Sequence, residues 1–321
     1  MQKCCHYDTM QSHNIKYCEY ELYANMAVLK NGEAFMKYTK IKQGLAVLLV
    51  VTFMLGLGGC SLIRRIYPHA GMVSVADGVG GELWVERSKK LEPADFNQED
   101  FSKGKVFAEY SGSDYQAMNG IDVSEHQQEI DWLAAKQAGV DFAIIRTGYR
   151  GYQKGTLQED AFFRKNIEGA LAAGIRVGVY FFSQAVTKQE AIEEAQYCIS
   201  QIDSYDISLP VFYDWENIGK GEEARTDSLD GKSVTEFCLA FAETIRGAGY
   251  TPGVYFYRSQ GYLFYDLDAL EGLEFWSAAV GDYPDFYYRH SFWQYSFTGK
   301  VAGIDIECDL NMMLLPAEKQ K

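Results

Sequence analysis

Hydrophobic and polar positions follow two rhythms along the chain after residue 118. Short apolar runs, typical of buried strands, alternate with longer segments in which apolar residues recur every three or four positions, as on one face of a helix. We expect strands at 121–123, 142–146, 177–182, 211–215, 253–257, 275–280, 292–295 and 304–310. We expect helices at 130–138, 160–173, 188–202, 234–248 and 262–270.

This order of elements predicts an α/β fold. Regular alternation of strand and helix places the strands parallel to one another, with the helices covering the sheet. Eight strands, of which five are followed by helices, indicate a modified TIM-like barrel with eight strands and about five helices. In such barrels the chemistry takes place at the carboxyl ends of the strands.

The segment 210–217 (PVFYDWEN) begins as an apolar run and ends in two carboxylates. Side chains alternate between the faces of a strand, so Asp214 and Glu216 point to the same side. Mutual repulsion and partial burial both raise a carboxyl pKa, and a carboxyl that keeps its proton near neutral pH can act as a general acid. Acids are also common where a strand runs into a solvated loop, so this spacing alone leaves both interpretations open.

Two further acids, Asp122 and Asp309, also lie near predicted strand ends. Four carboxylates that converge on one mouth of a barrel are less expected by chance than two on one strand. We find no His, Cys and Asp cluster with metal-ligand spacing and no glycine-rich phosphate loop, and we expect no cofactor.

The amino-terminal part has the pattern of a membrane anchor. Residues 44–63 carry no charge, and twenty apolar residues are what a helix needs to span a bilayer. Lys37, Lys40 and Lys42 precede the run, so the positive-inside rule places residues 1–43 in the cytoplasm and the chain after residue 63 outside the cell. Segment 36–42 resembles the natural start of a secretory signal, which makes 1–35 a candidate for a mis-assigned start.

The nature of the anchor stays open at this point. The segment 57–60 (LGGC) resembles the bacterial lipobox, in which the cysteine, here Cys60, is lipidated and becomes the new amino terminus. The apolar run continues past Cys60 and ends in two arginines, which favours a retained transmembrane helix. In either case the expected location is the cell membrane, with the folded domain outside the cytoplasm.

The remaining boundaries follow from composition. Residues 64–118 hold Gly-rich and acidic stretches without a sustained period, apart from a possible short strand at 83–85, and are predicted to be an extracytoplasmic linker. The domain is expected over 119–316. Cys198 and Cys238 lie in neighbouring predicted helices, either as buried free thiols or, outside the cell, as a disulfide.

The net charge of the chain limits the kinds of molecule that it can bind. The net charge is −14, and residues 1–65 contribute +4 of it, which leaves −18 on the remainder. So acidic a surface argues against nucleic acid and anionic lipid as ligands. The 23 tyrosines and five tryptophans suit either an aromatic core or a surface that stacks on flat rings such as sugars.

Taken together, these residues resemble glycoside hydrolase family 25, the lysozymes often called the Chalaropsis type. The resemblance spans roughly 119–314 and keeps the family's order. Its segments are 120–124 (GIDVS), 130–132 (IDW), 142–149 (FAIIRTGY), 166–183, 211–216 (VFYDWE), 293–296 (WQYS) and 309–311 (DLN).

The resemblance implies hydrolysis of the β-1,4 bond between N-acetylmuramic acid and N-acetylglucosamine in peptidoglycan. It places the family's general acid on Glu216 and its partner on Asp214, with Asp122 and Asp309 as the other two acids. Asp309 is the best match because Leu310 and Asn311 follow it, although Asp305 and Glu307 lie close by. A catalytically silent wall-binding module on the same barrel is the alternative.

Six aromatic residues are candidates for stacking on sugar rings, and core packing is the alternative for each of them. They are Tyr149, Tyr180, Trp215, Tyr255, Trp276 and Trp293. Tyr149 and Trp293 are the preferred candidates because they lie at strand ends.

Overall fold

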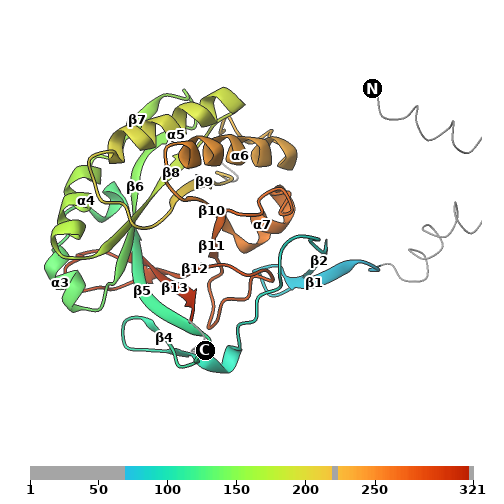
Figure 1. The fold of residues 1–321 in the computed structure, drawn as a ribbon, viewed down its shortest axis with the longest axis horizontal. Helices are drawn as coiled ribbons and strands as arrows, with labels where there is room; N and C mark the ends of the chain where they lie inside the picture. Colours follow the sequence, from blue (N-terminus) through green and yellow to red (C-terminus); the bar gives the residue numbers. More distant parts are fainter. Residues whose placement is uncertain (1–68, 219–222, 318–321) are drawn as a thin grey trace, which may run out of the picture. The chain divides into compact units, whose positions relative to one another are not determined.

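Eight strands close into a barrel in the computed structural model, which describes residues 69–218 and 223–317 (Figure 1). Around the barrel the strands follow the order β5-β13-β12-β11-β10-β9-β8-β6, and a pairing between β5 and β6 closes the ring. The strands are β5 (Tyr115–Val123), β6 (Phe142–Arg150), β8 (Arg176–Ser183), β9 (Val211–Trp215), β10 (Pro252–Tyr257), β11 (Glu274–Ala278), β12 (Phe292–Gly299) and β13 (Cys308–Pro316).

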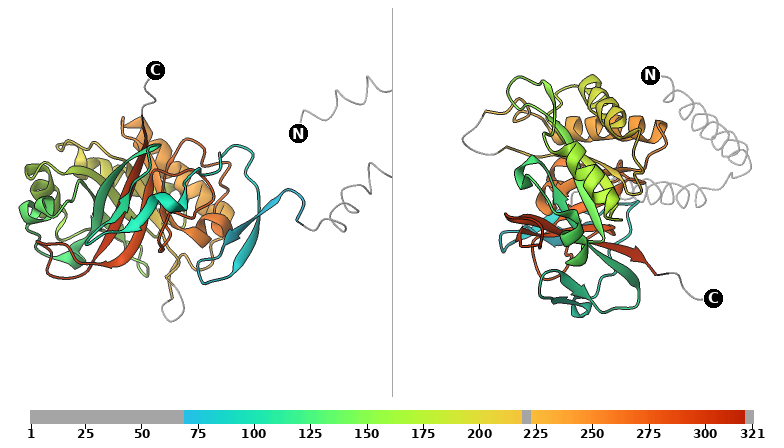
Figure 2. Two further views of the ribbon diagram at one scale, coloured as in Figure 1. Left: turned by 90° about the horizontal axis from the view of Figure 1, so that it is seen from below. Right: turned by 90° about the vertical axis from the view of Figure 1, so that its left-hand side faces the viewer.

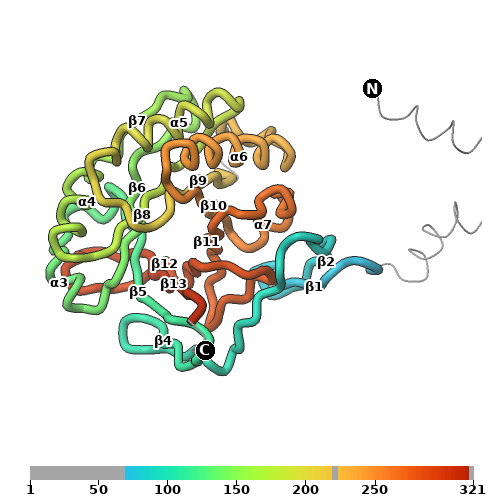
Figure 3. Tube along the Cα trace, in the orientation of Figure 1, coloured from blue at the N-terminus to red at the C-terminus, as the bar shows by residue number. Residues whose placement is uncertain are grey.

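Seven of these strands run parallel to one another, and β13 is antiparallel to both of its neighbours, β12 and β5. The tube in Figure 3 shows β13 between β12 and β5. The reversal brings the start of β13 to the rim at which the other strands end. A short strand, β7 (Leu157–Glu159), extends the sheet beyond β6.

The helices cover the outside of the barrel, as the alternation predicted. They are α3 (Trp132–Gln137), α4 (Phe163–Ala172), α5 (Lys188–Ile202), α6 (Gly231–Gly247) and α7 (Arg258–Phe264), and two 3₁₀ turns are η1 (Gln98–Asp100) and η2 (Glu125–Gln127). Side-chain caps begin several of them: Asp131, Thr187 and Asp230 each accept a hydrogen bond from a backbone N–H three residues on.

The predicted elements are confirmed with shifted bounds. The first strand begins at Tyr115 instead of residue 121, and the second extends to Arg150 instead of residue 146. The eighth strand begins at Cys308, because residues 304–307 form a bend outside the sheet. In this bend Ile304 is bridged to Ile130, and the Glu307 carbonyl accepts a hydrogen bond from Gln127 Nε2 at 3.3 Å. The predicted helix at 262–270 begins at Arg258, directly after β10, and ends at Phe264.

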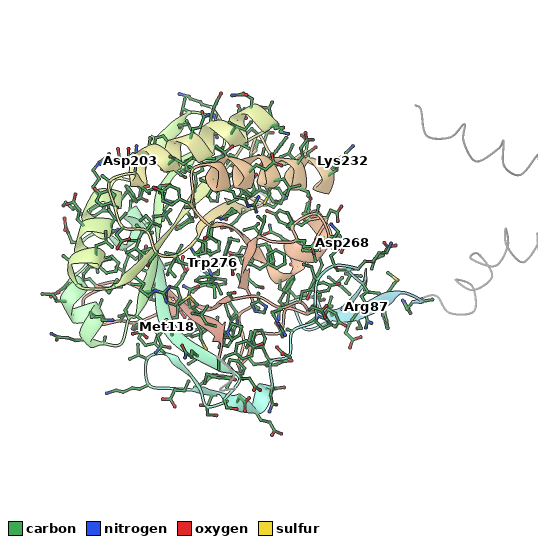
Figure 4. The ribbon with its side chains drawn as sticks, in the orientation of Figure 1. Arg87, Met118, Asp203, Lys232, Asp268 and Trp276 are labelled. Carbon is green, nitrogen blue, oxygen red and sulfur yellow. The ribbon has the colours of Figure 1, made fainter. Side chains whose placement is uncertain are left out.

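Strand alternation divides the apolar residues into an outer and an inner core. On β9, Val211, Tyr213 and Trp215 face the helices, whereas Phe212 and Asp214 face the barrel interior. Figure 4 shows Trp276 in the centre of the barrel, where it belongs to the inner core. This alternation of faces along each strand decides which side chains can reach the open end of the barrel.

The prediction of a linker is wrong from residue 71 onwards. The segment contains the hairpin of β1 (Met72–Ala76) and β2 (Glu82–Glu86) and the hairpin of β3 (Phe101–Lys103) and β4 (Ala108–Tyr110). It packs on the barrel domain: the Ala94 N–H donates to the Tyr287 carbonyl at 2.8 Å, and the Phe101 ring meets Trp293 edge-on at 5.6 Å. Single aromatic residues and backbone hydrogen bonds make these contacts, and neither leaves a periodic pattern in the sequence.

Several predictions concern residues outside the described ones, namely the start at 1–35, the span at 44–63 and the lipid site at Cys60. Within 69–218 and 223–317, no helix has both the length and the apolar character that a membrane span requires. Cys198 and Cys238 are buried free thiols, so they do not form the disulfide that was one of the two alternatives.

Candidate active site

The four acids singled out in the sequence meet at one rim of the barrel. Asp122 is the penultimate residue of β5, Asp214 that of β9, and Glu216 follows β9 directly. Asp309 is the second residue of β13 and lies directly opposite Asp122 in the antiparallel register. Three different stretches of chain therefore deliver four carboxyl groups to one place.

Two amide side chains hold Asp122 in place. Its Oδ2 accepts hydrogen bonds from Gln294 Nε2 at 2.8 Å and from Asn311 Nδ2 at 2.7 Å. Gln294 Nε2 also donates to Asp309 Oδ2 at 3.1 Å, so one amide group bridges the two carboxylates.

The amides are oriented in turn by aromatic side chains of the inner core. The Tyr255 hydroxyl donates to Gln294 Oε1 at 2.8 Å, and Trp276 Nε1 donates to Asn311 Oδ1 at 2.8 Å. Both amides thus have their oxygen occupied and their nitrogen directed at Asp122. Gln294 and Asn311 were not singled out as site residues, although each is a polar residue within an apolar strand and on its inner face, which is the signal that could have identified them.

Burial acts on every carboxyl of the group. It raises the pKa of Asp122 to about 6 despite the two amide donors. Burial, with repulsion from Asp122 and Glu216, raises the pKa of Asp309 to about 8. The site therefore retains protons at neutral pH that exposed carboxylates would lose.

Asp214 and Glu216 form a coupled pair. The two carboxyl groups lie close enough for Glu216 to raise the pKa of Asp214, and burial is the largest cause of a raised pKa in both. The pKa of Glu216 rises to about 7, with repulsion from Asp122 as the second cause, and that of Asp214 rises well above its usual value. Asp214 was expected to stay ionised, but burial and the neighbouring carboxyls Glu216 and Asp122 favour its protonated form as well.

One cation faces this acidic group. Arg146 lies on the inner side of β6, where its Nε donates to Asp160 Oδ2 at 2.8 Å and its Nη2 lies 3.2 Å from Glu125 Oε1. Its charge lowers the pKa of Asp214 and thereby offsets part of the effect of burial. Arg146 was not singled out from the sequence, although a charged residue within the apolar run FAIIRTGY marks it.

The six aromatic candidates divide by the face on which they lie. Trp215 and Trp293 are buried on the outer side of the barrel, where Trp215 packs on Phe264 at 5.3 Å and Trp293 Nε1 donates to the Ala279 carbonyl. Their prediction as sugar-stacking residues is therefore wrong. Each lies one position away from an inward-facing polar residue, so strand parity turns it towards the helices.

The other four candidates lie on the inner side or at the rim. Tyr255 and Trp276 are buried below the acids, with ring centroids 4.6 Å apart, and serve as the floor that orients the amides. Tyr180 and Tyr149 are half-buried beside Arg146, whose guanidinium lies 5.2 Å from the centre of the Tyr149 ring.

Comparison with known proteins agrees with this arrangement. The family model for glycosyl hydrolases family 25 matches residues 121–304, more than half of the chain. The chain belongs to glycosyl hydrolases family 25. It is therefore a glycoside hydrolase, and its activity is of the lysozyme type.

Two curated relatives of this family 25 enzyme are named as lysozymes. Lysozyme M1 of Streptomyces globisporus is 26% identical over 277 residues, which cover 81% of this chain and 89% of that protein. The autolytic lysozyme of Clostridium acetobutylicum is 26% identical over 198 residues, covering 60% of this chain and 55% of that protein.

A solved structure of a relative extends the likeness to the fold. The modular autolysin LytC from Streptococcus pneumoniae, solved also in complex with a synthetic peptidoglycan ligand, matches with a TM-score of 0.54 and 26% identity. The match covers 75% of this family 25 chain and 56% of the pneumococcal one.

Proposed function

We propose that this family 25 enzyme is a lysozyme of the Chalaropsis type, which cleaves the β-1,4 bond between N-acetylmuramic acid and N-acetylglucosamine in peptidoglycan. One observation carries the proposal: Asp214 and Glu216, whose pKa values are raised by burial, lie at the barrel rim together with Asp122 and Asp309. Glycoside hydrolysis needs a carboxylic acid that is protonated at working pH and a negative charge that stabilises the sugar cation, and this group supplies both.

Glu216 is the general acid. It follows the last residue of β9 and is the less buried member of the pair, so it can approach a glycosidic oxygen. A pKa of about 7 keeps the carboxyl protonated in mildly acidic and neutral solution. Its proton passes to the leaving oxygen as the glycosidic bond breaks.

Asp214 acts on the same side of the sugar as Glu216. Retaining enzymes with a carboxylate nucleophile hold their two carboxyl groups about 5–5.5 Å apart, and inverting enzymes hold them about 6.5–9.5 Å apart, in both cases across the bond. Asp214 and Glu216 are two residues apart at the end of one strand and point to the same side, so they do not face each other across a bond in either manner. Asp214 therefore orients the acetamide of the substrate, whose oxygen attacks the anomeric carbon, and this route retains the anomeric configuration.

Digestion of purified peptidoglycan by the full chain tests the function. We expect new reducing ends, and mass analysis should identify N-acetylmuramic acid at each of them. Proton NMR of the first product should show the β-anomer. Binding to the wall without release of reducing ends at any pH from about 4 to 8 would instead indicate a silent wall-binding module, and reducing N-acetylglucosamine would indicate a different bond.

We also propose that residues 44–63 tether the enzyme to the cell membrane, with the barrel outside the cytoplasm. The support is the charge-free run and the lysines before it. Membrane fractionation of cells that express the full chain tests this, with a protease added from outside. Replacement of Cys60 by Ala separates the two kinds of anchor: a retained helix keeps the variant in the membrane, whereas a lipid anchor is lost.

A further inference from the structure

The turn between β1 and β2 is held rigid close to the barrel. Asp77 Oδ1 accepts hydrogen bonds from the N–H groups of Val79 and Gly81, both at 2.8 Å. Gly78 has φ of +89°, and a Cβ at that position would lie 3.3 Å from Arg258 Nη2. Only glycine combines this backbone with so close an approach, so the turn is fitted to the barrel at this point.

A hollow of about 280 Å³ lies between this turn and the barrel rim. Its walls are Gly78 and Val79 from the turn, Tyr257 and Arg258 where β10 passes into α7, Val280 after β11, and Phe297 of β12. Figure 2 shows the β1–β2 hairpin beside the part of the barrel that contains α7. The hollow is near the lower limit of about 300 Å³ for small-molecule pockets, which suits a single sugar ring.

The surface of the hollow is aromatic and apolar. The rings of Tyr257 and Phe297 are 36% and 39% exposed, and their centroids lie 5.9 Å apart at 59°. Val280 and Val79 are 52% and 91% exposed beside them. The buried tryptophans of the outer core offer no such face, whereas these rings can stack on the flat side of a pyranose.

The charge of the hollow is already balanced. Arg258 forms an ion pair with Asp285, and the Asp77 carboxylate also lies within its field. A phosphate or peptide carboxylate would have to compete with these acids for the guanidinium. The hollow therefore favours an uncharged sugar with an apolar substituent, and an N-acetylated hexosamine has both properties.

The hollow is continuous with the catalytic group through one residue. Tyr257 lines it, and its hydroxyl, whose pKa is raised by burial, also lies close enough to Glu216 for the charge of that carboxyl to raise the pKa further. A glycan strand positioned for cleavage at Glu216 thus has a neighbouring sugar within reach of this hollow. We propose that the β1–β2 turn and the ends of β10, β11 and β12 form an additional glycan subsite, which binds an N-acetylhexosamine ring of the strand being cleaved. This inference rests on the proposed function.

The dependence of cleavage on chain length tests the subsite. Peptide-free glycan strands of increasing length are digested by the full chain and by the Phe297→Ala, Phe297→Tyr and Leu133→Ala variants. For Phe297→Ala we expect kcat/KM to fall about fivefold to tenfold, through KM, only on strands long enough to fill the subsite. Phe297→Tyr keeps the ring and should behave as the parent. Leu133→Ala removes a more exposed apolar residue, 65% accessible, from α3, which is outside the hollow.

An equal loss on strands of every length, or no loss on long strands, would overturn the subsite while leaving the proposed function intact. If the parent chain cleaves no strand, the proposed function fails, and calorimetric titration of the Glu216→Gln variant with the same strands then tests the subsite alone. The subsite is supported if the affinity of the Glu216→Gln variant rises with strand length and the Glu216→Gln, Phe297→Ala double variant lacks the gain seen with the longest strands. Affinity that is independent of length, or the same in both variants, refutes it.

Discussion

Asp122 and Asp309 face each other across the β5–β13 pair, and the amide nitrogen of Gln294 donates to both, at 2.8 and 3.1 Å. This arrangement depends on the direction of β13. In a strand parallel to β5, a residue at the start would lie at the opposite end of the barrel. Because β13 is antiparallel, its second residue reaches the rim at which β5 and β9 end, and its charge adds to theirs.

Replacement of Glu216 by Gln should reduce turnover by about 10²–10⁴-fold, since an amide cannot supply the proton and general acid catalysis contributes an effect of this size. The shape of the side chain is kept, so the melting temperature and glycan affinity should change little. Release of reducing ends from peptidoglycan measures turnover, and calorimetry measures the melting temperature and the glycan affinity. Glu236→Gln on the exposed face of α6 is the matched control, and a Glu216→Gln variant with full activity would remove Glu216 as the acid.

Replacement of Asp309 by Asn should lower activity, whereas Asp305→Asn should leave it unchanged. The two acids are four residues apart, and the sequence offered both. Asp309 lies in β13 and contacts Gln294, whereas Asp305 is exposed in the preceding turn. An assay of kcat/KM on one peptidoglycan preparation compares them. A greater loss in Asp305→Asn would show that the strand register has been assigned to the wrong acid.

The alkaline limit of activity should move to lower pH in an Asp122→Asn variant. Asp122, with a pKa of about 6, is ionised near neutral pH and raises the pKa of Glu216 by repulsion. Asparagine removes the charge but can still accept the hydrogen bond from Asn311. Glu216 then loses its proton at lower pH, by roughly one unit. The pH profile of kcat/KM measures the shift, and a limb that moves upward would contradict the assigned repulsion.

Much of the site could be predicted because a strand has a period of two residues. Once Asp214 is assigned to the inner face, Glu216, two residues later, belongs to the same face. The same alternation places Trp215 on the outer face, so it cannot stack on a sugar at the barrel rim. The alternation does not show how deeply a side chain is buried. Tyr255 and Trp276 lie on the inner face, but both are buried below the acids and form the floor of the site. Gln294 and Asp122 are 172 residues apart in sequence, and no local pattern encodes the hydrogen bond between them.

The free energy of unfolding should fall as pH rises from about 6.5 to 8. The buried carboxyls of Glu216, Glu194 and Asp309 have pKa values of about 7, 7 and 8, against roughly 4 in an unfolded chain. The folded state therefore binds more protons across this window, and stability is lost as they dissociate. His290, whose pKa burial lowers to about 4, has the opposite effect, but only below about 6.5.

Denaturant unfolding at several pH values measures this slope. The Glu216→Gln variant lacks one of the titrating groups and should show a flatter dependence, whereas Glu236→Gln should keep that of the parent. Stability that rises between these pH values would show that the carboxyls are ionised in the folded protein without cost.

The folded domain should require residues 71–118 as well as the stretch that resembles the family. A chain shortened to 119–321 loses Tyr115 and its neighbours at the start of β5, which pair with the end of β13, and it loses Phe101, which covers Trp293. It also loses the N–H of Ala108, which donates to the Tyr295 hydroxyl at 3.0 Å. Removal of a buried Phe alone costs on the order of 3–5 kcal/mol, a large part of the stability of a typical domain.

Comparison of chains shortened to 71–321 and 119–321 tests this requirement, since both lack the first 70 residues and differ only in the packed segment. We expect the longer chain to unfold cooperatively and the shorter one to melt at a much lower temperature or to aggregate, because Trp293 and one edge of β13 become exposed. Equal melting temperatures would mean that the segment lies on the barrel without stabilising it. A linker would contribute nothing to the melting temperature, whereas a packed segment raises it. The measurement therefore distinguishes the linker that composition predicted from the packed segment that the structure shows.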